Sequence, residues 1–266
     1  MYETTYHRPN SIDEAVALFA KASEPRYLAG GHTLIPTMKQ RLAAPTDVID
    51  IARIPGLSGI EVSGEAVTIK AATTHYDVAR SDAVRKAIPA LCMLAGDIGD
   101  PQVRYRGTIG GSIANNDPSA DYPAAVLALG ATITTNKRGI AADDYFKGLF
   151  TTALEDGEII TAVVFPVPAK AGYAKFPNPA SRFALTGVFV AKLKSGAVRV
   201  AATGASQSGV MRLPDIERAL AASWSEATLD KMRISADGLI ADVHGPAAYR
   251  ANLIGVMARR AIAAAG

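Results

Sequence analysis

Two pairs of adjacent glycines constrain the fold of this chain more than any other feature of its sequence. They lie in AGGHT (29–33) and TIGGS (108–112), each after strand-like apolar residues and before helix-like ones. Glycine has no Cβ, so its peptide N–H can approach a ligand closely and its φ can be positive. Successive peptide N–H groups ahead of a helix form a concave site for an anion. The pattern therefore has two interpretations: two tight turns, or two loops that bind two linked phosphates from opposite sides.

Polar side chains near the glycines favour the phosphate-binding interpretation. Thr33, Thr108 and Ser112 add hydroxyl donors. Four further hydrogen-bonding residues follow the second pair, namely Asn115, Asn116, Asp117 and Asp121. Asp117 and Asp121 could form a carboxylate pair for acid–base chemistry, or serve as a turn residue and as an acceptor for cofactor hydroxyls. The Rossmann fingerprint Gly-x-Gly-x-x-Gly and the phosphate loop of ATPases are both absent, so the pattern indicates a dinucleotide held in another way.

Composition argues against several other classes of protein. Of 266 residues, 49% are hydrophobic and 20% charged, which is typical of a folded globular chain. The net charge of +3 is spread along the sequence without a Lys/Arg run, so we expect no nucleic-acid partner. The single cysteine, Cys92, lies in an apolar helical pattern and is predicted to be a core residue; alone it can hold neither a disulfide nor an iron–sulfur cluster. The four histidines lack metal-ligand spacing, so no metal site is expected.

No targeting or membrane segment is legible. The start, MYETTYHRPN, lacks the basic flank and apolar core of a signal peptide. The longest apolar run, YPAAVLALGATI, has about a dozen residues, whereas a bilayer requires ~20. We therefore expect no membrane span and a cytoplasmic location.

Apolar periodicity predicts a mixed α+β chain. The expected elements are a helix in 10–23; a strand, a turn, a short helix and a second strand in 25–51; a hairpin around Gly64 in 59–80 that leads into a polar turn; a helix in 83–99; a helix running into a strand in 122–135; a strand in 156–167; a hairpin in 181–206; and helices in 213–223, 225–240 and 247–265. The segment VPAKAGY (167–173) is rich in Pro, Gly and Ala and predicts a domain boundary.

Two long segments resemble a known family. YLAGGHTLIPTMKQRLAAPTDVIDI (27–51) and GDIGDPQVRYRGTIGGSIANNDPSADYPAAVLALGA (96–131) are similar to the medium, FAD-binding subunit of molybdenum hydroxylases. The aerobic carbon monoxide dehydrogenase branch is the most similar, and xanthine dehydrogenase carries the same module. KFPNPASRFALTGVFVAKL (175–193) and DVHGPAAYRANLIGVMARRA (242–261) resemble the C-terminal domain of the family, so the resemblance covers almost the whole chain.

The resemblance implies an α+β fold in two domains. Residues 1–168 would form a two-lobed FAD-binding domain of the vanillyl-alcohol-oxidase (PCMH) type, with lobes at about 1–52 and 53–168. Residues 172–266 would form a small C-terminal α/β sheet-and-helix domain of the carbon monoxide dehydrogenase flavoprotein type.

The resemblance also implies which residues bind FAD, without a covalent link. Residues 29–34 and 108–112 would wrap the pyrophosphate and neighbouring groups, Asp121 matches a cofactor-binding position, and Ile160 matches an apolar position near the cofactor. The full set is Ala29, Gly30, Gly31, His32, Thr33, Leu34, Thr108, Ile109, Gly110, Gly111, Ser112, Asn115, Asp121 and Ile160. No acid, base or nucleophile is assigned to this chain, because the redox chemistry belongs to the cofactor.

By the same resemblance the chain is the electron-transfer subunit of a molybdenum-dependent oxidoreductase. A separate large subunit would carry the molybdenum cofactor, and a separate small subunit with [2Fe–2S] clusters would pass electrons to the flavin, which delivers them to an external acceptor. A dimer of heterotrimers is the implied assembly. The alternatives are a self-sufficient flavin oxidoreductase, for which the roughly 95 residues after the first domain leave little room for a larger cap domain, and a non-catalytic nucleotide-binding protein.

Four residues near the loops keep open roles. Tyr105 stands where the resemblance leads us to expect Asn before RGTIGG. His32 can supply a hydrogen bond or a positive field to the cofactor, or pack within its loop. Arg104 and Arg106 can face a partner, the phosphates or solvent.

Overall fold

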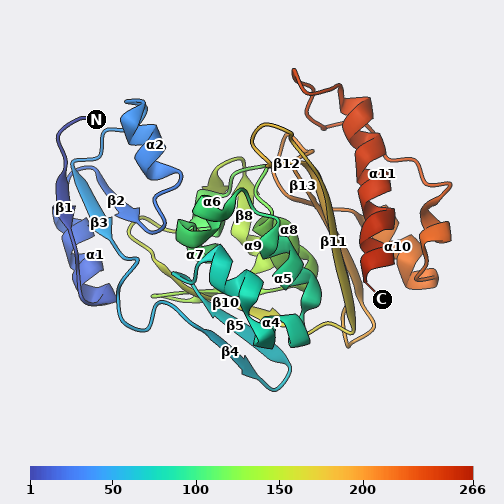
Figure 1. Ribbon diagram of the computed structural model, residues 1–266, viewed down its shortest axis with the longest axis horizontal. Helices are drawn as coiled ribbons and strands as arrows, with labels where there is room; N and C mark the ends of the chain where they lie inside the picture. Colours follow the sequence, from blue (N-terminus) through green and yellow to red (C-terminus); the bar gives the residue numbers. More distant parts are fainter. Residues whose placement is uncertain (266) are drawn as a thin grey trace.

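Four β-sheets organise residues 1–265, which are the residues that the computed structural model describes. In Figure 1 an N-terminal sheet, a central part and a C-terminal sheet follow one another along the long axis of the molecule. The N-terminal sheet is parallel, with the order β1 (Thr5–His7), β3 (Asp47–Asp50), β2 (Pro25–Leu28). Because the three strands are parallel, their carboxyl ends lie at one edge of the sheet.

The helices of this first part follow local sequence signals. Helix α1 (Ile12–Lys21) begins after Ser11, whose side chain accepts a hydrogen bond from the backbone N–H of Glu14. The Glu14 carboxylate accepts from the Asn10 N–H at 2.7 Å, one residue before the N-cap, so the contact resembles a capping box. Helix α2 (Leu34–Lys39) follows the first glycine pair, and Pro36 fits its first turn.

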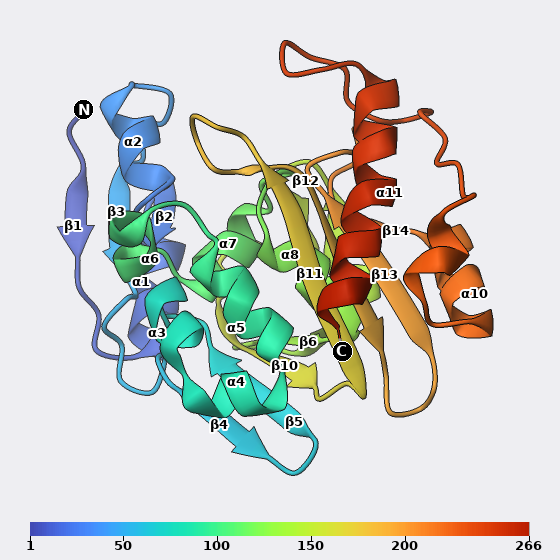
Figure 2. The same cartoon turned by 45° about the vertical axis from the view of Figure 1, so that its right-hand side comes forward.

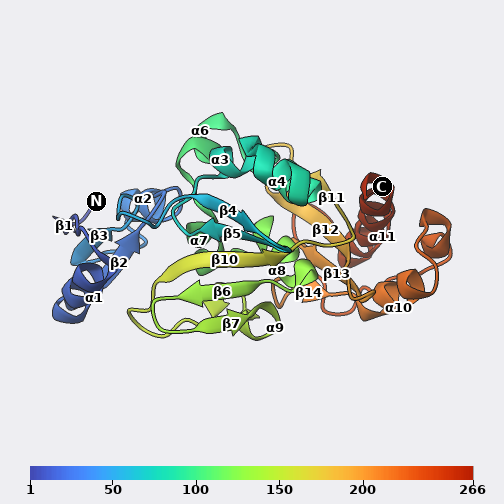
Figure 3. The same ribbon diagram turned by 90° about the horizontal axis from the view of Figure 1, so that it is seen from below.

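The central part is built on a five-stranded sheet. Figure 3 shows its strands side by side in the order β4 (Ile60–Ser63), β5 (Ala66–Lys70), β10 (Ile160–Pro166), β6 (Thr132–Thr135) and β7 (Gly139–Ala141). The other elements of this part are α3 (His75–Arg80), α4 (Asp82–Ala87), α5 (Pro89–Gly96), α6 (Pro101–Arg106), α7 (Ile109–Asn115), α8 (Tyr122–Leu129), α9 (Ala142–Tyr145), β8 (Phe146–Gly148) and β9 (Thr151–Thr152).

The C-terminal sheet has the order β11 (Lys170–Pro177), β12 (Ala184–Lys192), β13 (Val198–Thr203), β14 (Met211–Arg212). Helix α11 (Ala247–Ala264) packs on β11 and β12, as Figure 2 shows. Helix α10 (Pro214–Ala222) packs on β13, and a 3₁₀ turn, η1 (Glu226–Leu229), packs on α11.

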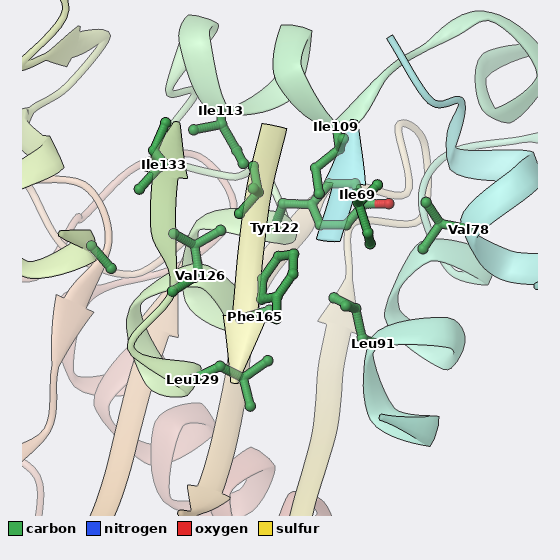
Figure 4. Packing of buried hydrophobic residues seen from close by; sticks show 14 of the residues in the cluster. Ile69, Val78, Leu91, Ile109, Ile113, Tyr122, Val126, Leu129, Ile133 and Phe165 are labelled. Carbon is green, nitrogen blue, oxygen red and sulfur yellow. The ribbon is translucent and has the colours of Figure 1, made fainter. Parts of the chain in front are cut away.

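Helix α8 explains the longest apolar run of the sequence. All eight of its residues are buried, because the helix contacts β10 of the central sheet and β12 and β13 of the C-terminal sheet. In Figure 4 the ring of Phe165 from β10 lies among the side chains of Tyr122, Val126 and Leu129 from α8. A helix that is apolar all round is one buried on every side. Within residues 1–265 no helix is both long and apolar enough to cross a membrane.

The structure confirms most expected elements and corrects several. The helix expected in 83–99 is two helices, because Pro89 has no N–H to continue the first and instead begins α5. The polar turn expected after the hairpin is helix α3, which Thr74 caps. The helix expected in 225–240 is only η1 followed by irregular chain.

Two further differences concern the second glycine segment and the strand content of 167–173. TIGGS does not follow a strand: α6 precedes it, and both of its glycines lie in the first turn of α7. The segment 167–173, where a domain boundary is expected, contains the first half of β11, a strand that the sequence does not predict. Cys92 is a core residue as expected, and its Sγ donates to the Ala79 carbonyl oxygen at 2.9 Å.

Candidate functional site

One large cavity of about 770 Å³ brings the two glycine segments together. Its walls come from the loop after β2, from α2 and α7, from the loop before α8, from the start of β10 and from the 181–183 loop. The volume lies in the upper part of the range for small-molecule sites. Thirteen of the fourteen residues that the sequence predicts for the site line it, namely Ala29, Gly30, Gly31, His32, Thr33, Leu34, Thr108, Gly110, Gly111, Ser112, Asn115, Asp121 and Ile160.

Ile109 is the exception. Its side chain is fully buried in the core, and its backbone N–H donates to the Thr73 carbonyl oxygen at 3.1 Å. Its position anchors α7 to the central sheet and places it behind the wall of the cavity.

The first glycine segment carries a run of free backbone donors. None of the six N–H groups from Ala29 to Leu34 donates to an acceptor within residues 1–265; the first that does is Ile35, which donates to the Gly31 carbonyl oxygen. Gly31 has φ +74°, a conformation that favours glycine. A Cβ on Gly30 would overlap the Arg106 carbonyl oxygen, so this glycine lets the loop lie directly against the end of α6. The result is a run of six donors, without acceptors in the part of the chain that the structure describes, in residues that line the cavity.

The second glycine segment differs from the first, because the amides from Ile109 to Ser112 already have partners. Gly110 N–H donates to the Ala71 carbonyl oxygen at 2.9 Å, Gly111 N–H to Thr108 Oγ1 at 3.1 Å, and Ser112 N–H to the Thr108 carbonyl oxygen at 3.0 Å. A Cβ on Gly110 would lie 2.6 Å from the Ala71 Cβ, so this glycine permits close packing of α7. The segment can therefore donate hydrogen bonds to a ligand from its hydroxyl side chains but not from the amides of Ile109 to Ser112.

A buried ion pair lies beside the cavity. Lys175 Nζ lies 2.9 Å from Asp121 Oδ1 and donates to the Asp97 carbonyl oxygen at 2.7 Å. Tyr173 Oη donates to Asp121 Oδ1 at 2.6 Å. The side chains of Lys175 and Asp121 are 5% and 3% exposed. Burial raises the pKa of the Asp121 carboxyl, and the Lys175 ammonium opposes that rise.

Sequence reasoning missed Lys175. Its one signal is a lysine within the otherwise largely apolar strand β11, where a buried partner would be required. Because that partner lies 54 positions earlier in the chain, the spacing alone does not reveal it.

His75 is a second residue that sequence reasoning missed. It lines the cavity, is 5% exposed, and its ring lies 5.4 Å from that of Tyr122. Burial lowers the pKa of His75 to about 4, and the positive fields of His32 and Arg104 add to the effect. The ring is therefore neutral at pH 7. Its Nδ1 and the Tyr122 hydroxyl are buried without a hydrogen-bond partner within residues 1–265.

We expect His75 to make the protein less stable in acid. Its pKa is lowered from 6.5 to about 4. Between these pH values the histidine is protonated in the unfolded chain but not in the folded chain. The free energy of unfolding therefore has its full value above pH ~6.5 and decreases as the pH falls toward 4. At about 1.4 kcal/mol per pKa unit, the loss amounts to about 3 kcal/mol. Urea unfolding at pH 7.5 and pH 4.5 measures this loss. The difference in the free energy of unfolding between the two pH values should be smaller for His75→Gln than for the native chain, and as in the native chain for His244→Gln, which changes an exposed histidine. Equal differences for the two variants would contradict the assignment.

Several open roles are decided by the geometry. Asp117 is a turn residue, since its Oδ1 accepts from the Ser119 N–H at 2.8 Å, and it does not pair with Asp121. His32 Nε2 lies 3.2 Å from the Gln102 carbonyl oxygen, which ties its loop to α6. Arg104 donates to the carbonyl oxygens of Ile98 and Gly99, so its role is structural.

Apolar side chains line other parts of the cavity. Ile160 and Ile98 contribute aliphatic surface, and Phe150 and Phe183 contribute rings that are about half exposed. Flat heteroaromatic rings bind to such surfaces through burial of their faces. The cavity thus combines a row of amide donors, hydroxyl groups, one buried carboxylate and apolar surface.

The comparisons with known proteins agree with this arrangement. Residues 2–168 match the family described as "FAD binding domain in molybdopterin dehydrogenase". The chain is 39% identical to the carbon monoxide dehydrogenase medium chain of Afipia carboxidovorans, over 97% of this chain and 94% of that one. It is 35% identical to the nicotine 6-hydroxylase medium subunit of Paenarthrobacter nicotinovorans, over 98% and 96%.

A solved structure shows the same fold. Carbon monoxide dehydrogenase from Hydrogenophaga pseudoflava matches with a TM-score of 0.88 and 36% identity, over 99% of this chain and 97% of that one. The fold is therefore an α+β FAD-binding fold of the PCMH type with a C-terminal sheet-and-helix part. The chain belongs to the family of FAD-binding medium subunits of molybdenum hydroxylases.

Proposed function

We propose that this chain is the electron-transfer flavoprotein subunit of a molybdenum-dependent hydroxylase or dehydrogenase. The observation that carries the proposal is the run of six free backbone N–H groups from Ala29 to Leu34 at the wall of the 770 Å³ cavity. Such a row suits the two negative charges of a diphosphate. The rest of the cavity fits FAD as well, because it offers hydroxyl groups, a carboxylate and apolar surface to the sugar and ring parts.

Each part of the cavity would have a separate task. The first segment would hold the diphosphate through its amides, and Thr33, Thr108 and Ser112 would add hydroxyl donors. Asp121 would accept hydrogen bonds from cofactor hydroxyls, and the Lys175 ammonium would keep its carboxylate charged and in place. Ile98 and Ile160 are the residues we propose for contact with flat rings. When bound, FAD supplies the one- and two-electron redox chemistry, while the chain orients it and shields it from water.

The names of the relatives support a multi-subunit assembly. Those relatives are medium chains or subunits, and this chain spans nearly all of their length. We therefore propose a large molybdenum-cofactor subunit and a small [2Fe–2S] subunit as partners, in a dimer of heterotrimers in the cytoplasm. In this assignment residues 1–168 hold the cofactor and residues 172–266 close over it.

A cofactor titration tests the proposal directly. We expect FAD to give a saturable shift of its visible absorbance bands with the purified chain, and intact FAD to be recovered after acid release. FMN lacks the second phosphate and the adenosine, so we expect it to bind at least 100-fold more weakly. Absence of a shift with FAD, even with the partner subunits present, would refute the flavin assignment.

A reduction experiment separates a subunit from a self-sufficient oxidoreductase. Under anaerobic conditions, substrate of the complex should bleach the bound flavin only when the molybdenum and iron–sulfur subunits are both present. Bleaching by substrate with this chain alone would support the self-sufficient alternative instead.

A further inference from the structure

A second, smaller pocket opens at the carboxyl edge of the N-terminal parallel sheet. It has a volume of about 280 Å³. Arg8 follows β1, Ala29 follows β2, and Arg53 lies three residues after β3. Residues just beyond the carboxyl end of each strand therefore line the pocket. The end of α6 closes it with Tyr105 and Arg106. The carboxyl ends of parallel strands are where α/β sheets most often bind ligands.

Three arginines in this pocket have no partner. Within residues 1–265, the guanidinium groups of Arg8, Arg53 and Arg106 form no ion pair and no hydrogen bond. Several other arginines are engaged; Arg199, for example, donates to Asp143 at 2.7 Å. Three cations that line one small pocket repel one another, and an anion between them would remove that cost.

The one carboxylate in the pocket is already occupied. Asp50 Oδ2 accepts from the Tyr6 hydroxyl at 2.7 Å, and its Oδ1 accepts from the Ala52 N–H at 3.0 Å. It lies beyond ion-pair distance of all three arginines. The pocket therefore carries three cations against one carboxylate, a positive excess that the sequence hides because Arg8, Arg53 and Arg106 are 45 and 53 positions apart.

The size and chemistry of the pocket define the ligand class. Guanidinium groups bind the oxygens of phosphates and carboxylates with paired N–H donors. A volume of 280 Å³ lies just below the usual range for whole drug-sized ligands, so the pocket suits a compact anion or the anionic end of a larger molecule. Three arginines that line one pocket match a dianion better than a single carboxylate.

We propose that this pocket is a second anion site, which binds inorganic phosphate or a phosphomonoester group. It is separate from the FAD cavity, since most of its lining residues do not line the larger one. The two share Ala29, Ala72 and Thr108 in their walls, but none of the three arginines lines the larger cavity. The proposal does not depend on FAD binding.

The test is a calorimetric titration of FAD-saturated protein at low ionic strength with two probes, inorganic phosphate and glycerol 3-phosphate. Bound FAD prevents phosphate from binding to the free amides of residues 29–34. We expect one saturable site, at least tenfold weaker in Arg53→Ala/Arg106→Ala. The matched control, Arg85→Ala/Arg218→Ala, removes the same charge from two exposed arginines elsewhere and should bind as the native chain does.

The outcomes separate the sources of the anion. Equal binding of both probes supports a phosphomonoester ligand, and binding of inorganic phosphate alone supports the free ion. No saturable binding, or equal binding by the two double variants, overturns the proposal. Binding of an oligoglutamate peptide but not of phosphate, lost in Arg53→Ala/Arg106→Ala, also overturns it, because the pocket would then receive an acidic protein segment. If the chain fails to bind FAD, the same comparison of variants on FAD-free protein still decides the question.

Discussion

Replacing Lys175 with Met should strongly destabilise the protein. The substitution leaves the Asp121 carboxylate buried beside Tyr173 without its cation. Removal of one partner from a buried ion pair costs ~3–5 kcal/mol. In a chain of this size that corresponds to a fall in melting temperature of about 6–20 °C, measured by scanning calorimetry. The loss should be larger at pH 8 than at pH 5, because without the ammonium the burial-raised pKa of Asp121 rises further and protonation relieves the buried charge.

Lys194→Met is the matched control for this prediction. Lys194 also forms an ion pair, with Glu65 at 2.8 Å, but both side chains are well exposed. Exposed pairs contribute ~0–1 kcal/mol, so the melting temperature should hardly change. The double variant Asp121→Asn/Lys175→Met should recover part of the loss, because it removes the uncompensated charge. Equal losses for Lys175→Met and Lys194→Met would show that the buried pair has no special role.

Replacing Gly30 with Ala should reduce FAD affinity about 100-fold, or about 2.7 kcal/mol. The new Cβ would overlap the Arg106 carbonyl oxygen and lie 2.7 Å from the Gly107 Cα. Both neighbours are backbone, so the loop itself must move. Its displacement would scatter the six free amides that we propose for the diphosphate. The effect is measured by titrating FAD with the variant and monitoring the quenching of flavin fluorescence.

Gly255→Ala provides the comparison. Gly255 lies within α11, and a Cβ there meets nothing within 4 Å. Alanine favours a helix over glycine by up to ~1 kcal/mol, so this variant should be as stable as the native chain or slightly more, with unchanged FAD affinity. Native affinity in Gly30→Ala would mean that the first glycine segment does not position the cofactor.

Local signals account for much of the fold. Ser11 with Glu14 marks the start of α1, Gly64 marks the turn between β4 and β5, and the apolar run from Tyr122 marks α8. The missed elements depend on tertiary packing instead. Strand β11 has a composition typical of a linker, and it is ordered by pairing with β12 along its whole length. The helical periodicity in 225–240 reflects apolar side chains, among them Leu229 and Met232, that pack without a regular helix into the core formed by β12, β13, α10 and α11.

The candidate site was predictable only in part, for a similar reason. The sequence located both glycine segments because glycine pairs are rare and local. It could not distinguish their tasks, since two partners of the second segment, Ala71 and Thr73, lie 39 and 36 residues earlier, in the turn after β5. His75 and Lys175 escaped notice because their significance lies in burial beside groups far away in the sequence.

The position of α8 between two sheets also affects how the chain is made. The helix ends at Leu129, but β12 and β13, which cover one of its faces, are complete only about 70 residues later. At synthesis rates of ~5–20 residues per second, that apolar face waits on the nascent chain for about 4–14 s. During this time it is a target for chaperones and for aggregation. Expression of residues 1–168 alone would make the exposure permanent, so we expect that fragment to be recovered mainly as insoluble protein, although it contains nearly the entire wall of the cofactor cavity.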